Sequence, residues 1–195
     1  MDKYLVTDEI KECYKALEFT YEQLNKCEID SYCWKWAIIG MHNALQNFMV
    51  SALRDGMGNN ILKERIREKH YDSISQGNFG SVNESLNFFL ELYNDIKGDE
   101  MLKYTNSKKY TPEKGDDYEV KNLNDSRNSF IHFIPMGIET EVLIYVDFFD
   151  VAIKIIKFLV IESRNILFVE QSERDYTIKL ITQIELLLQK YRQMI

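Results

Sequence analysis

Apolar side chains recur at helical spacing along most of this chain. They stand three to five positions apart between residues 3 and 27, and a denser set follows between residues 34 and 53. Intervals of three and four residues place side chains on one face of an α-helix, whereas strand residues alternate every second position. The same helical spacing returns over residues 86–96. This periodicity predicts helices rather than strands.

Residues that end helices are sparse and fall between these ranges. Only 2 prolines and 8 glycines occur among 195 residues, which favours long helices over a turn-rich β-fold. We therefore expect an all-α fold, a single helical bundle of five to seven helices. Its main helices are expected at residues 3–27, 31–56, 81–96, 118–133, 139–164 and 172–193.

Two of these ranges carry a further signal. Ser81 and Glu84 have the spacing of a capping box, which would open the third of these helices. Pro135 is expected to stop the helix of residues 118–133. A strand at residues 141–148 is the alternative to the helix there, but the flanking periodicity favours the helix.

The composition suits one packed domain that spans residues 1–195. Hydrophobic residues make up 45% of the chain and aromatic residues 13%, enough for a core and unlike a disordered protein. The net charge of -7 argues against a generic nucleic-acid-binding surface, which would be basic. It still permits a nuclease whose positive charge is concentrated at one site.

The three cysteines, Cys13, Cys27 and Cys33, lack the spacing of a zinc site. Four acidic residues among the first twelve argue against a secretory leader, so we expect free thiols in a reducing cytoplasm. The most apolar run, residues 142–161, contains two aspartates and two lysines, which predicts a core helix rather than a membrane span. The sequence also lacks the glycine-rich phosphate loop, the serine-nucleophile elbow and the zinc-protease motif, so no cofactor is expected.

The segment R-N-S-F-I-H, residues 127–132, is the strongest candidate for chemistry. Arg127 is a permanent cation, Asn128 is a polar orienting group, and His132 can carry a proton near neutral pH. These three groups supply what metal-free cleavage of a phosphodiester needs. They stand in an otherwise apolar, helix-compatible stretch.

The spacing from arginine to histidine is informative only together with its surroundings. Random placement of the arginines and histidines of this chain predicts about 0.1 pair five positions apart. The chain contains two such pairs. Arg65 and His70 form the other one, but charged residues separate them and indicate a solvated helix face.

The segment resembles the R-N-x-x-x-H signature of HEPN domains, small helical bundles that often act as ribonucleases. The likeness extends over residues 123–135, L-N-D-S-R-N-S-F-I-H-F-I-P. On an ideal helix Asn128 and His132 share a face, whereas Arg127 and His132 diverge by about 140°. The resemblance implies a homodimer, in which two arginines and two histidines surround one scissile phosphate.

The resemblance further implies a metal-independent endoribonuclease whose RNA substrate supplies its own nucleophile, the 2′-hydroxyl. His132 would act as general base or acid, and Arg127 would bind the phosphate and stabilise its developing charge. Asn128 would orient the histidine or donate to the phosphate. The implied setting is a bacterial toxin–antitoxin or phage-defence system, with an antitoxin or regulatory protein as a further partner and no membrane partner.

Two other interpretations of the motif stay open. Many HEPN domains are non-catalytic, so the same groove could bind nucleotide, RNA or a partner protein without turnover. An arginine–asparagine pair can also simply brace a helix end in a structural dimeric bundle, and a single histidine on a half-apolar helix is usually packed or solvated.

The predicted second helix carries two further candidates. His42 and Asn43 belong either to a packed helix or to a second wall of the cleft that faces His132. Trp34 and Trp36 stand two positions apart and cannot both face the core, so one is expected at an interface or against a ligand.

The predicted loop before residue 118 is locally basic and aromatic. It is either a solvated loop or a surface that contacts phosphates and stacks on bases. Its lysines and tyrosines are Lys103, Tyr104, Lys108, Lys109, Tyr110 and Lys114.

Overall fold

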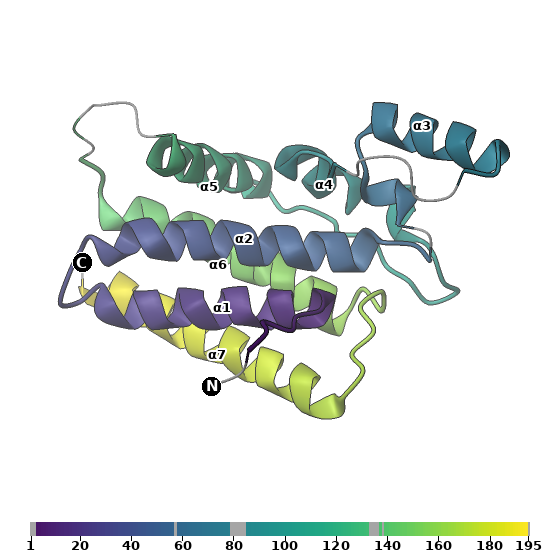
Figure 1. Cartoon of the computed structure of the whole chain (residues 1–195). Coiled ribbons are helices and arrows are strands. Elements are labelled where there is room, and N and C mark those ends of the chain that lie inside the picture. Colours follow the sequence, from purple (N-terminus) through teal and green to yellow (C-terminus); the bar gives the residue numbers. More distant parts are fainter. Residues whose placement is uncertain (1–2, 57, 79–84, 133–136, 138, 195) are drawn as a thin grey trace.

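Seven α-helices and two short 3-10 helices make up the regular structure. The computed structural model describes residues 3–56, 58–78, 85–132, 137 and 139–194, and no strand occurs within these ranges. The predicted all-α bundle of five to seven helices is therefore confirmed. In chain order (Figure 1) the elements are α1 (Glu9–Lys26), α2 (Cys33–Leu53), η1 (Asn59–Ile61), α3 (Glu64–Ser75), α4 (Phe89–Asp95), η2 (Asp99–Met101), α5 (Asp116–Ile131), α6 (Val142–Ile161) and α7 (Gln171–Met194).

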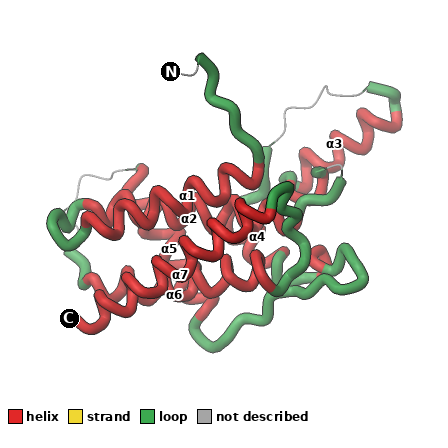
Figure 2. Tube along the Cα trace, turned by 90° about the horizontal axis from the view of Figure 1, so that it is seen from below, coloured by secondary structure: helices red, strands yellow, loops and turns green. Residues whose placement is uncertain are grey.

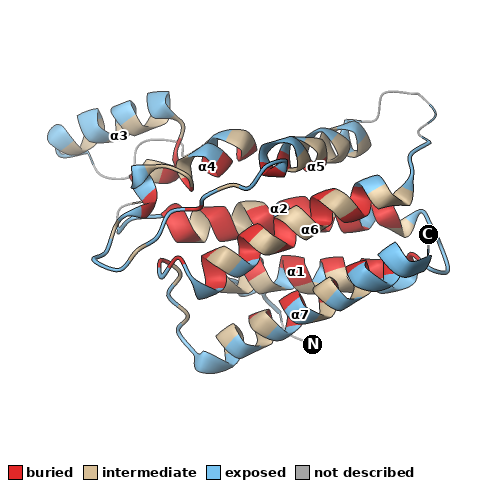
Figure 3. Cartoon of the chain, turned by 180° about the vertical axis from the view of Figure 1, so that it is seen from behind, coloured by how far each residue is buried: buried red, intermediate tan, exposed pale blue. Residues whose placement is uncertain are grey.

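Helices α2 and α6 form the middle of the bundle. Both pack against α5 on one side, while α1 and α7 cover the other side (Figure 1). Buried residues concentrate on these two central helices (Figure 3). Helix α3 stands apart from the bundle (Figure 2), and none of its residues is buried.

The core is rich in aromatic rings at the contact between α2 and α6. Phe48, Phe148 and Phe149 are fully buried. The ring of Trp34 lies 5.0 Å from the ring of Tyr191 and 5.9 Å from that of Phe149, measured between ring centroids. Aromatic pairs at these separations contribute more than their buried area alone.

Only one of the two tryptophans is buried, as the sequence predicts. Trp34 is 4% exposed, whereas Trp36 is 43% exposed. The ammonium of Lys35 lies 5.3 Å from the centroid of the exposed ring.

The apolar run of residues 142–161 coincides with α6, and most of its residues belong to the core. It is the predicted helix, so the alternative of a strand at residues 141–148 is wrong. Over the described ranges, every helix is too short or too polar to cross a membrane.

Two helices begin clearly later than expected. The helix expected at residues 81–96 is observed as α4 and begins only at Phe89; Leu86, expected on its apolar face, instead forms an isolated antiparallel bridge with Leu62. The first helix begins at Glu9 rather than near residue 3, because the side chain of Asp8 accepts a hydrogen bond from the backbone N–H of Lys11 and caps it. Leu5, expected on the apolar face, lies before the helix and is 91% exposed. Ser81 and Glu84, the predicted capping box, lie outside the described residues, as does Pro135.

Candidate functional site

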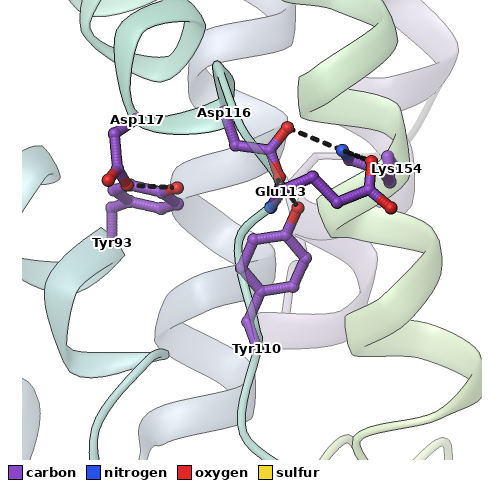
Figure 4. A network of polar contacts seen from close by, with 6 residues as sticks. All are labelled: Tyr93, Tyr110, Glu113, Asp116, Asp117 and Lys154. Carbon is purple, nitrogen blue, oxygen red and sulfur yellow. Dashed lines mark hydrogen bonds and ion pairs between the residues drawn. The ribbon is translucent and has the colours of Figure 1, made fainter.

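Helix α5 carries the arginine–asparagine–histidine motif, and its first turn is held by a polar network (Figure 4). Asp116 is only 2% exposed. Its carboxylate accepts hydrogen bonds from the Tyr110 hydroxyl at 2.6 Å and from the Lys154 ammonium at 2.6 Å. The backbone N–H of Glu113 donates a third bond at 2.8 Å. These contacts attach the start of α5 to α6 and to the preceding loop.

Burial alone would raise the pKa of Asp116. The bonds from Lys154, Tyr110 and the Glu113 backbone outweigh burial, so the pKa of this carboxyl is lowered. A buried carboxylate with satisfied partners and a helix start beside it is a structural anchor.

The next residue links the same turn to α4. The Tyr93 hydroxyl donates to the carboxylate of Asp117 at 2.9 Å, and the Lys97 ammonium lies 3.0 Å from the same oxygen. Asp117 is largely exposed, with 68% of its side chain accessible. The start of α5 is thus bound on two sides, but by one buried and one exposed carboxylate.

The motif lies at the opposite end of α5. Arg127 and Asn128 are half-buried residues of its last turn, and the Arg127 guanidinium Nη1 donates to Asn128 Oδ1 at 2.9 Å. His132 follows directly after the helix as its C-cap, with its backbone N–H bound to the Asn128 carbonyl at 2.9 Å. Its side chain is exposed.

The structure joins two of the three predicted site residues. Asn128 orients Arg127, whereas among the described residues none is hydrogen-bonded to the imidazole of His132. His132 is the C-cap, and its backbone N–H still makes the helical bond to the Asn128 carbonyl, so the shared face expected for these two residues is compatible with the backbone geometry. One protomer therefore offers a held guanidinium and, separately, an imidazole open to solvent.

His42, expected either to pack within its helix or to form a second wall of the cleft, is packed and lies next to this motif. His42 of α2 is 4% exposed, and its Nε2 lies 3.3 Å from Asn124 Oδ1, one turn before Asn128 on α5. Its ring stacks on Phe89 of α4, with centroids 3.9 Å apart. The bonded partner of His42 is thus Asn124. The sequence indicated His42 as a candidate residue, but its partner could be sought only from the helical spacing of Asn124, Arg127 and Asn128.

Burial makes His42 a neutral group. Its pKa is lowered to about 4, chiefly by burial and further by the charge of Arg127, while the bond to Asn124 opposes the shift. An amide oxygen only accepts hydrogen bonds, so the neutral ring donates through Nε2–H. The guanidinium of Arg127 is therefore the cation of this neighbourhood, with a neutral donor beside it.

The second arginine–histidine pair, Arg65 and His70, lies on α3, and several residues of the lysine-rich loop contact other parts of the protein. Arg65 is exposed on α3, in agreement with a solvated helix face, whereas His70 is half-buried. In the loop, the Lys103 ammonium donates to the Arg54 carbonyl, and Lys109 pairs with Asp99 at 3.1 Å. Tyr110 is buried in the Asp116 network, so it is not available to stack on a base.

The three cysteines are free thiols. Burial raises the pKa values of Cys13 and Cys27 to about 12, so neither is ionised or reactive at neutral pH. Within the described ranges, no group of three or more histidine, cysteine or acidic side chains is placed to hold a metal ion.

No family model, no curated protein and no solved structure matches this chain. The motif and its surroundings on α5, α2 and α4 are therefore the basis for a functional proposal.

Proposed function

We propose that this protein is a metal-independent endoribonuclease of the HEPN type, with Arg127, Asn128 and His132 as its site. The observation that carries the proposal is that the side chains of Arg127 and His132 have different environments. Asn128 holds the guanidinium of Arg127 at 2.9 Å, and the His132 imidazole is exposed immediately after the helix. A held cation and a free proton carrier are the two parts that phosphodiester cleavage needs.

In the proposed reaction, the imidazole of His132 removes the proton from the RNA 2′-hydroxyl. The resulting oxygen attacks the adjacent phosphorus, a 2′,3′-cyclic phosphate forms, and the bond from phosphorus to the 5′-oxygen breaks. A protonated second imidazole returns a proton to the departing 5′-oxygen, which leaves as a hydroxyl. Arg127 stabilises the negative charge that develops on the phosphate oxygens, through one or two charge-assisted hydrogen bonds.

A second protomer completes this site in the proposal. Each chain supplies one His132, so two chains are needed to place two of these imidazoles beside one phosphate. Ile131, next to His132, is 46% exposed, and such an apolar side chain would be covered by a second copy. The proposed biological setting is a bacterial toxin–antitoxin or phage-defence system.

One observation favours a second candidate function. A catalytic base is normally oriented by a third group, and no described residue is hydrogen-bonded to the His132 imidazole. A module that binds RNA or a partner protein through Arg127, without turnover, would not need that orientation.

The test compares the wild type with His132→Ala for cleavage of RNA in the presence of EDTA. The wild type should release products that end in a 2′,3′-cyclic phosphate and a 5′-hydroxyl, and the variant should not. His70→Ala is the matched control, because His70 has the same spacing to an arginine and should be dispensable. Equal cleavage by wild type and His132→Ala, or strict dependence on a metal, would refute the proposal. RNA binding without cleavage would support the second candidate.

A further inference from the structure

The hydrogen bond between His42 and Asn124 holds the motif end of α5 to the rest of the bundle. Among the residues that the structure describes, it is the side-chain hydrogen bond that joins residues 118–132 to another helix. The other bonds of this range remain within α5, such as Ser129 to the Asp125 carbonyl. The orientation of the motif therefore depends on apolar packing and on this one directional contact.

Helix geometry carries the effect of the bond to the motif. Asn124, Arg127 and Asn128 occupy positions i, i+3 and i+4, which share one face of a helix. A rotation of α5 about its axis would move all three side chains together. The bond to Asn124 fixes the rotation of α5 about its axis, and it thereby fixes the direction in which the Arg127 side chain points from the helix.

The imidazole itself is held on two sides. Its ring stacks on Phe89 of α4 with centroids 3.9 Å apart and planes inclined by 20°, and its Nε2 faces Asn124. The ring plane is thereby set by α4 while the ring belongs to α2. Three helices meet at this one side chain, and its N–H is the group that makes the directional contact with α5.

We infer that His42 is a positioning residue for the site: by bonding Asn124 it sets the orientation of α5 that presents Arg127 to the substrate phosphate. This inference rests on the proposed function. His42 does not touch the substrate and transfers no proton. It remains neutral at physiological pH, so it adds no second charge that would repel the guanidinium.

Two substitutions at this position separate the donor from the ring. His42→Phe keeps the stacking on Phe89 and removes the N–H, whereas His42→Gln keeps an N–H donor at a similar reach and removes the ring. We expect His42→Phe to reduce kcat for RNA cleavage by roughly tenfold or more, with a smaller change in KM, because small misplacements of catalytic groups are costly. His42→Gln should restore most of the lost rate. Asn124→Leu should reproduce the defect, and the double variant should be no worse than either single one.

A second measurement does not depend on activity. The NMR signal of the Arg127 guanidinium Nε–H, assigned through an Arg127→Lys sample, should shift in His42→Phe and return toward its wild-type position in His42→Gln. If the wild type cleaves no RNA, the proposed function fails. If the Arg127 Nε–H signal is unshifted in His42→Phe, the positioning role of His42 is overturned independently of the proposed function. Full activity of folded His42→Phe, or an equal loss in His42→Gln, would also overturn it. If His42→Phe does not fold, Asn124→Leu decides the matter by the same two measurements.

Discussion

The Nε2 atom of His42 lies 3.3 Å from the amide oxygen of Asn124, a residue 82 positions further along the chain. This contact joins the central helix α2 to α5 one turn before the arginine–asparagine pair. The two ends of α5 are thus attached in different ways. The buried ion pair of Asp116 with Lys154 holds its start, and the neutral imidazole of His42 holds its last turns.

Stability should fall between pH 7 and pH 5 because of His42. The pKa of His42 in the folded protein is about 4, below the ordinary histidine value. The unfolded chain therefore binds the proton more readily than the folded one. The free energy of unfolding decreases as the pH falls below the pKa of the unfolded state. We expect a loss of about 2 kcal/mol over this range from this residue. Urea unfolding at several pH values measures it. His42→Phe cannot titrate and should show a flatter profile; parallel profiles for the two proteins would contradict the prediction.

Replacement of Arg127 by lysine should impair RNA cleavage although the charge is kept. Lysine has a single ammonium, so it cannot bind a phosphate in the bidentate way or repeat the 2.9 Å bond to Asn128 in the same geometry. We expect kcat/KM to fall by at least about tenfold, which corresponds to about 1.4 kcal/mol. Arg65→Lys, on the exposed face of α3, is the control and should change nothing. Wild-type kinetics for Arg127→Lys would mean that the guanidinium is not part of the site.

Loss of the Asp116 carboxylate should destabilise the fold much more than loss of Asp117. Asp116→Ala leaves the buried Tyr110 hydroxyl without its acceptor and removes the partner of Lys154, at an expected cost of about 2 to 3 kcal/mol. Asp117→Ala removes a contact at an exposed carboxylate and should cost less than about 1 kcal/mol. Urea unfolding of the two variants gives the comparison directly. Equal losses would show that burial of Asp116 does not matter.

Gly40 allows α1 and α2 to approach closely, and alanine should not fit there. An added Cβ would lie 2.7 Å from Thr20 Oγ1 and 2.9 Å from the Phe19 ring. The Thr20 hydroxyl is buried and bound to the Ala16 carbonyl, so it cannot easily turn away. We expect Gly40→Ala to destabilise by about 1 to 2 kcal/mol despite the better helix propensity of alanine. Gly56→Ala, where a Cβ meets nothing within 4 Å, should be close to neutral, and thermal unfolding measures both.

Much of the helical architecture could be predicted because its signals are local. The apolar spacing predicted six of the seven α-helices, and α5 and α6 begin and end within three residues of the expected limits. Helix α3 was missed because none of its residues is buried, so it has no apolar face to recognise. Trp34 and Trp36 are two positions apart on one helix, so it was predictable that only one of them is buried. The exact start of α1 was missed, although Asp8 and its bond to Lys11 follow a known capping pattern.

The candidate site could be predicted only in part. Arg127 and Asn128 are neighbours in the chain, so their contact follows from one helix turn, and the exposure of His132 follows from the end of that helix. The buried role of Asp116 could not be foreseen, because in the sequence it is one of several charged residues after a glycine. Its burial depends on Lys154 and Tyr110, which come from other elements.

The sequence by itself determined that this chain forms a helical bundle and that an arginine, an asparagine and a histidine share the end of one helix. Periodicity and helix breakers act over a few residues, so they can be recognised without knowledge of the partners. Only the tertiary structure decided that His42 meets Asn124 and Phe89, and that Asp116 is buried. Such contacts depend on how each helix is rotated and shifted against its neighbours, and that arrangement is set by the packing of the whole core.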